Sequence, residues 1–164
     1  MKKVMFFFIM MGLLIILSTK QSYACSCADF DVDEYLNQDN RVLIYGTVHK
    51  KLSGRRVIFK VQENYSKNVV NQYITIYTTT TVGASCGVNF NDYERKELLI
   101  RGNLDEGDTV MKVGLCSIKH IQSGNINRIT LDDERYETIT LTELNNHVSQ
   151  TYEGQDYGEI NENN

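Results

Sequence analysis

Four cysteines constrain this chain more than any other feature, and two of them, Cys25 and Cys27, are separated by a single residue. The other two, Cys86 and Cys116, lie far along the chain. An even number of cysteines in a small exported domain indicates a disulfide framework. A bond between Cys25 and Cys27 would close a small, strained ring, so two pairings remain. Each of them ties the first cysteines to the body of the domain.

The first 24 residues have the pattern of a cleaved signal peptide. Lysines at the start precede an apolar stretch over residues 4–17, and the small residues Ser22 and Ala24 lie just before Cys25. This stretch is shorter than the roughly 20 residues that span a membrane, which makes an uncleaved anchor helix the weaker interpretation. We therefore expect a secreted protein with Cys25 as its first mature residue.

Two other interpretations of this N-terminus are less favoured. Cleavage before a cysteine also precedes lipid attachment, but Ser22 and Tyr23 stand where an aliphatic and a small residue are expected. Acylation of Cys25 would also leave an odd number of cysteines. A redox Cys-x-Cys pair needs an exposed thiol of low pKa, and the sequence predicts no histidine or helix N-terminus beside it. Structural disulfides are therefore favoured.

Removal of the leader makes the chain distinctly acidic. The leader contains three of the 17 lysines and arginines, so 14 remain against 21 aspartates and glutamates, a net charge of about −7. Such a surface repels phosphate backbones, so we expect no nucleic-acid partner. We also expect no cofactor, no membrane span in the mature chain and a monomer. Residues 25–152 are expected to form one domain, and the acidic, amide-rich residues 153–164 a disordered tail.

The predicted elements favour a mainly β fold. Five runs are rich in β-branched and aromatic residues and read as strands: 41–49, 55–65, 73–80, 97–101 and 109–118. Val57, Phe59 and Val61 alternate with more polar residues, which predicts a strand with one buried face. Short strands flanked by helices predict a closed or partly closed antiparallel barrel, of which the OB-fold is the five-stranded example.

Two helices are predicted, one on either side of these strands. Residues 31–36 form the first, with Asp31 as its N-cap. The second covers about residues 141–150, where Thr140 and Glu143 have the spacing of a capping box. Leu141, Leu144 and Val148 form a narrow apolar stripe that is expected to pack on the sheet.

Several short motifs now occur in a familiar order. They are CSCA at 25–28, VLIYG at 42–46, ITIYT at 74–78, ASCGV at 84–88, ELLI at 97–100 and LC at 115–116. Together they resemble the N-terminal domain of the tissue inhibitors of metalloproteinases, which is a netrin-like module. The resemblance covers residues 25 to about 118 and implies an OB-fold barrel.

The resemblance also implies disulfides Cys25–Cys86 and Cys27–Cys116. In this family the α-amino nitrogen and carbonyl oxygen of the first residue, here Cys25, chelate the catalytic zinc of the protease. The side chain of Ser26 would point toward the specificity pocket. Six residues would contact the protease: Cys25, Ser26, Cys27, Ala28, Ala84 and Ser85. The family's third disulfide is missing, since Asn37 stands near the position of its first cysteine.

The sequence therefore leads to two hypotheses for a protein that is not expected to be an enzyme. The first is a secreted inhibitor of zinc metalloendopeptidases, and the second is a netrin-like module that binds another envelope or extracellular protein. No metal site is expected in the chain itself, because His49, His120 and His147 lack ligand spacing. The acidic run at 132–134 is expected to be a solvated loop.

Overall fold

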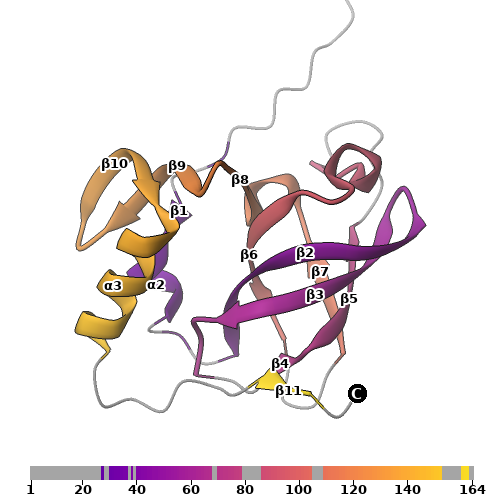
Figure 1. Cartoon of the computed structure of the whole chain (residues 1–164), viewed down its shortest axis with the longest axis horizontal. Coiled ribbons are helices and arrows are strands. Elements are labelled where there is room, and N and C mark those ends of the chain that lie inside the picture. The colour runs from indigo at the N-terminus through magenta and orange to yellow at the C-terminus, as the bar shows by residue number, and fades with distance from the viewer. Residues whose placement is uncertain are drawn as a thin grey trace, which may run out of the picture.

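A computed structural model describes residues 27, 30–36, 38, 40–67, 70–78, 86–104, 109–152 and 160–162 (Figure 1). The fold is mainly β, as predicted, with two α-helices and two short 3₁₀ helices in the described part. The predicted signal peptide lies outside the described residues. Among the residues that are described, no helix has the length and apolar character needed to cross a membrane.

The strands are short except for one long hairpin. Their bounds are β1 Phe30–Asp31, β2 Arg41–Ser53, β3 Arg56–Asn64, β4 Val70–Asn71, β5 Tyr73–Thr78, β6 Glu97–Asn103, β7 Val110–Val113, β8 Ile118–Gln122, β9 Asn125–Leu131, β10 Glu134–Thr140 and β11 Ile160–Asn161. The helices are α2 Val32–Leu36, α3 Leu141–Thr151 and the 3₁₀ helices η2 Phe90–Tyr93 and η3 Leu115–Ser117.

Nine of these strands form one sheet. Its order is β1-β9-β8-β6-β2-β3-β5-β7, and β10 pairs with β9. Most pairs are antiparallel, but β5 pairs with β7 and β1 with β9 in parallel. The sheet curls so that β7 returns toward β6, where a Cβ atom on Gly102 would lie 2.5 Å from the Sδ atom of Met111. A side chain at Gly102 would therefore hold the two strands apart.

The curled sheet is buried on both faces near its middle. In β2, Val42 and Ile44 point into a core enclosed by the curl, whereas Leu43 points into a second core beneath the helices. Leu99 in β6 belongs to that second core as well. Burial on both faces explains why VLI at 42–44 and LLI at 98–100 are uninterrupted apolar runs. Figure 1 shows both helices on the same side as the β9–β10 hairpin.

Both predicted helices are confirmed. The Glu34 backbone N–H donates to Asp31 Oδ1 at 2.9 Å, so Asp31 caps the first turn of α2. At α3, the Glu143 backbone N–H donates to Thr140 Oγ1 and the Thr140 backbone N–H donates to Glu143 Oε2, as in a capping box. Leu144 and Val148 are buried and join the helix to the sheet.

The prediction of five strands undercounts the sheet. The run at 109–118 is divided, because β7 ends at Val113 and η3 separates it from β8. Strands β9 and β10 were not predicted from the sequence. Most side chains of β10 are exposed, because it is an edge strand, so it lacks the alternation that marks a half-buried strand. The parallel pairing of β5 with β7 also departs from an all-antiparallel barrel.

The structure describes part of the tail at 153–164, which was predicted to be disordered. Ile160 and Asn161 form β11, which pairs in parallel with β4, and the Gln72 backbone N–H donates to the Asn161 carbonyl at 3.0 Å. Ile160 also packs against the core enclosed by the sheet. The prediction of disorder is therefore wrong at these two residues, where one isoleucine and backbone hydrogen bonds offset the polar composition.

Candidate functional site

The predicted contact residues are concentrated at the N-terminus and before Cys86. Five of them, Cys25, Ser26, Ala28, Ala84 and Ser85, lie outside the described residues. Cys27 is described and exposed. The surroundings of the predicted site are therefore given by Cys27 and by Cys86, which directly follows Ser85.

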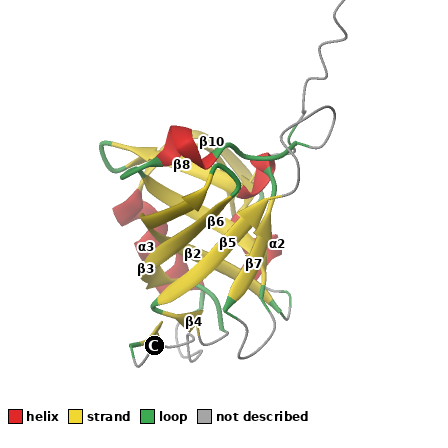
Figure 2. Cartoon of the chain, turned by 90° about the vertical axis from the view of Figure 1, so that its right-hand side faces the viewer, coloured by secondary structure: helices red, strands yellow, loops and turns green. Residues whose placement is uncertain are grey.

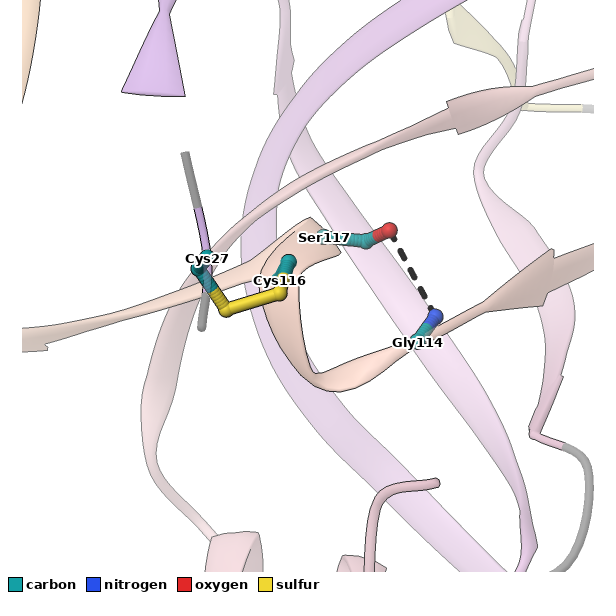
Figure 3. The surroundings of a disulfide bond; sticks show 4 residues. All are labelled: Cys27, Gly114, Cys116 and Ser117. Carbon is teal, nitrogen blue, oxygen red and sulfur yellow. Dashed lines mark hydrogen bonds between the residues drawn. A yellow bond between two sulfur atoms is a disulfide. The ribbon is translucent and has the colours of Figure 1, made fainter. Parts of the chain in front are cut away.

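Cys27 forms a disulfide with Cys116, as the resemblance implies. Their Cα atoms lie 5.3 Å apart, although 89 positions separate them in the sequence (Figure 3). Cys116 lies in η3, whose start is held by two hydrogen bonds. The Gly114 backbone N–H donates to Ser117 Oγ at 3.4 Å, and the Ser117 backbone N–H donates to the Gly114 carbonyl at 3.0 Å. The short helix is thus a well-supported anchor for Cys27.

Cys86 contacts the same anchor from another direction. Its carbonyl accepts a hydrogen bond from the Leu115 backbone N–H at 2.7 Å. Two residues later, the Val88 backbone N–H donates to Thr78 Oγ1 at 3.1 Å, which fixes this segment to the end of β5. Cys86 is also disulfide-bonded and has a positive φ of 45°. The predicted Cys25–Cys86 bond includes a residue outside the described ones and stays a prediction.

We call Cys27, Cys86 and residues 114–117 the cysteine corner. Three of the four cysteines meet here, and Leu115 exposes 38% of its surface at this place. Cys27 lies within the predicted contact segment 25–28, and Cys86 directly follows the segment 84–85. The described residues Cys27 and Cys86 therefore lie in one region of the tertiary structure.

A second cluster lies on the side of the helices. The carboxylate of Asp33 in α2 accepts hydrogen bonds from three groups: the Asp132 backbone N–H at 2.7 Å, the Tyr152 hydroxyl at 3.1 Å and, in the tautomer that donates from Nε2, the His147 ring at 2.9 Å. The other ring nitrogen of His147 lies 3.5 Å from the Asp132 carboxylate. The side chain of His147 is only 10% exposed. The cluster connects α2, α3 and the turn between β9 and β10.

This second cluster borders an open hollow of about 580 Å³. The lining is strongly acidic and consists of Asp31, Asp33, Glu34, Asp132, Asp133, Thr151 and Tyr152. One ligand atom each from Asp33, Asp132 and His147 lie within 4.8 Å of one another, so these three residues could hold a metal ion. In the structure Asp33 and His147 already share a hydrogen bond, and the Asp132 carboxylate lies 3.5 Å from the other ring nitrogen of His147, which is sufficient to explain their arrangement.

No pattern in the sequence indicated this cluster. His147 was expected to be isolated, and 132–134 a solvated loop. Asp132 and Asp133 do form a tight turn, with φ values of 49° and 62° that match a type I′ hairpin turn. However, 114 positions separate His147 from Asp33, and no local spacing signals a contact of that range. The other two histidines lie elsewhere, His49 against Tyr73 and His120 exposed in β8.

Comparisons with known proteins add no assignment. No family model matches the chain, and no curated protein matches it.

Proposed function

We propose that this protein is a secreted inhibitor of zinc metalloendopeptidases that acts through the mature N-terminus at Cys25. The observation that carries the proposal is the cysteine corner. Cys27, which belongs to the first predicted contact segment, and Cys86, which directly follows the second, are both attached to residues 114–117. Such a corner would hold the two segments side by side as one ridge. Part of the same proposal is that the curled sheet is the barrel of a netrin-like module of the OB-fold type.

The proposed chemistry requires a free and rigid N-terminus. A catalytic zinc keeps one position open for water or substrate. The α-amino nitrogen and the carbonyl oxygen of Cys25 would fill it as a five-membered chelate that offers no peptide bond for cleavage. An α-amino group ordinarily has a pKa of about 7.7–8.0, so a lone pair is available near neutral pH. Disulfides at the first and third residues reduce the entropy that is lost on binding.

The decisive test adds one alanine before Cys25. The added residue converts the α-amine into an amide, whose nitrogen has no lone pair for the metal, and it would collide with the metal site. We expect the extended protein to keep its fold and disulfides but to lose inhibition of a panel of zinc endopeptidases. Ser26→Gly serves as the comparison, because it removes a pocket contact and leaves the chelate intact. This variant should only weaken inhibition or change the preferred protease.

The extended protein also separates inhibition from simple binding. Equal inhibition constants for the native and extended proteins would exclude zinc chelation by Cys25. Absence of inhibition by the correctly processed native protein across the panel would also reject the proposal. In either case the netrin-like binding module becomes the leading hypothesis, because such a module tolerates an additional alanine with little change in affinity.

A further inference from the structure

Positive charge is concentrated on one hairpin of this acidic protein. Residues 41–62, which include β2 and most of β3, contain six lysines and arginines and no aspartate or glutamate. Four of the six surround the tip of the hairpin, and all four are exposed: Lys50, Lys51, Arg55 and Arg56. The chain as a whole has 21 acidic residues against 17 basic ones, so this concentration runs against the overall charge.

The sheet extends this charge across neighbouring strands. Arg56 of β3 lies opposite Tyr77 of β5, and Tyr77 lies opposite Lys112 of β7. Directly opposed residues point to the same face of a sheet, about 5 Å apart from strand to strand. Arg56, Tyr77 and Lys112 therefore form a row in which an aromatic ring lies between two cations. Figure 2 shows β5 and β7 on a side of the molecule where no helix lies in front of them.

These cations have no acidic partner in the described part of the chain. Arg135 forms an ion pair with Glu137 in β10, which pairs with β9 near the other end of the sheet, and His147 forms one with Asp33 from α3. Because no described acidic side chain neutralises these cations, the hairpin and the two neighbouring strands can attract an anionic ligand. We call Lys50, Lys51, Arg55, Arg56 and Lys112 the basic face.

A hollow of about 290 Å³ lies within the basic face. It is lined by Leu52, Ser53, Arg55, Arg56, Tyr77 and Thr78. Two guanidinium groups are suited to carboxylate, sulfate or phosphate groups, because each can donate two parallel hydrogen bonds. The hydroxyl groups of Ser53 and Tyr77 add donors and acceptors of the kind that bind sugar hydroxyls. Tyr77 also provides an apolar ring next to these polar groups.

We propose that the basic face binds an acidic polysaccharide, with one charged sugar unit in the hollow between Arg55, Arg56 and Tyr77. A repeating anionic chain matches a row of cations that continues from the hairpin tip to β7. A membrane surface fits less well, because Leu52 and Val110 are the large apolar residues exposed on the described strands of this face, and two such side chains give little apolar area for insertion. This surface shares no residue with the cysteine corner, and its proposed binding does not depend on protease inhibition.

The test measures binding of the exported chain to heparin and to polygalacturonate, which carry sulfate and carboxylate groups. Neutral dextran, phosphatidylglycerol vesicles and single-stranded DNA are the comparison ligands. We expect binding to the acidic polysaccharides that weakens with added salt. The double variant Arg55→Gln/Arg56→Gln should weaken it about tenfold or more, since hydrogen bonds from two charged groups are lost. Tyr77→Thr should weaken binding of the polysaccharides while leaving the charge unchanged.

A matched control removes two positive charges elsewhere. Lys67→Gln/Arg128→Gln changes exposed residues beyond the far end of β3 and in β9, and it should leave polysaccharide binding within about twofold. Thermal unfolding of each variant shows that its fold is intact. The proposal is overturned if neither acidic polysaccharide binds, if both double variants lose binding equally, or if Tyr77→Thr has no effect. Tighter binding of vesicles or DNA than of either polysaccharide would also reject it.

Discussion

Asp33 is the residue at which three parts of the fold meet. Its carboxylate accepts hydrogen bonds from the turn after β9 through the Asp132 backbone N–H, and from α3 and its end through His147 and Tyr152. Burial by itself raises the pKa of the Asp33 carboxyl, but these hydrogen bonds and the nearby His147 outweigh it, so the pKa lies below its ordinary value. A carboxyl whose pKa is lowered by folding stabilises the fold at pH values above the ordinary pKa of that group. This stabilisation is lost as the pH falls through the lowered pKa.

Asp33→Asn should therefore destabilise the protein in a pH-dependent manner. At pH 7 we expect the free energy of unfolding to fall by about 1 kcal/mol, because charge-assisted hydrogen bonds become neutral ones. The difference from the native protein should shrink as the pH falls below about 3.9, since the native carboxyl then becomes protonated too. Urea unfolding across this pH range measures both effects.

Asp133→Asn is the matched control for this change. Asp133 lines the same acidic hollow but makes no hydrogen bond or ion pair with the described residues, and asparagine tolerates its positive φ. Its substitution should change stability by less than about 0.5 kcal/mol. A destabilisation by Asp33→Asn that is the same at pH 7 and at pH 2 would argue against a contribution from the ionised carboxylate.

At the scale of elements, α3 begins where its local sequence specifies. Thr140 and Glu143 satisfy each other's backbone N–H groups at the start of the helix, with distances of 2.7 and 3.1 Å. The hydrogen bonds from Thr140 also lower the pKa of the Glu143 carboxyl. Leu144 and Val148 then place the helix on the second core. His147, which lies between these two buried residues in the sequence, meets Asp33 of α2.

Thr140→Ala should weaken this helix start. Loss of an N-cap side chain typically costs about 1 kcal/mol, and here it also removes a partner of Glu143. Thr142→Ala is the control, since Thr142 lies exposed in the first turn and makes no hydrogen bond in the described part through its side chain. We expect a lower melting temperature for the first variant and little change for the second. Equal melting temperatures would show that tertiary packing alone sets the start of α3.

At the scale of the whole molecule, the Cys27–Cys116 bond joins the start of the described chain to the connection between β7 and β8. The segment after Cys27 then leads into β1, which pairs with β9 at one edge of the sheet. The bond therefore links an edge of the sheet to the cysteine corner. It closes a long loop, and a long loop is the case in which cross-linking reduces the entropy of the unfolded chain most.

Replacing both cysteines, as Cys27→Ser/Cys116→Ser, should lower the free energy of unfolding by about 2–5 kcal/mol. Changing both partners together avoids leaving a free thiol that can exchange with the remaining cysteines. Chemical unfolding monitored by circular dichroism measures the loss, and a loss below about 1 kcal/mol would contradict an important role for this bond. Inhibition should weaken as well if the proposed function is correct, because the N-terminus would become less rigid.

The sequence by itself determined the elements whose signals are local. Alternation at Val57, Phe59 and Val61 predicted β3, and the pairs Asp31–Glu34 and Thr140–Glu143 predicted where the helices begin. Period-two alternation and helix capping depend on residues a few positions apart, so they can be recognised without a tertiary structure. The Cys27–Cys116 pairing was also predicted, but through a family resemblance, since the residues alone left two pairings open.

Only the tertiary structure decided which distant residues meet. It brought Asp33, Asp132 and His147 together, gathered Cys86 with residues 114–117, and aligned Arg56, Tyr77 and Lys112 in one row. It also added β9 and β10 at the edge of the sheet and paired β11 with β4. Such contacts depend on strand order and on the curl of the sheet, which arise when the whole chain buries two cores at once. Local sequence patterns do not specify that arrangement of the whole chain.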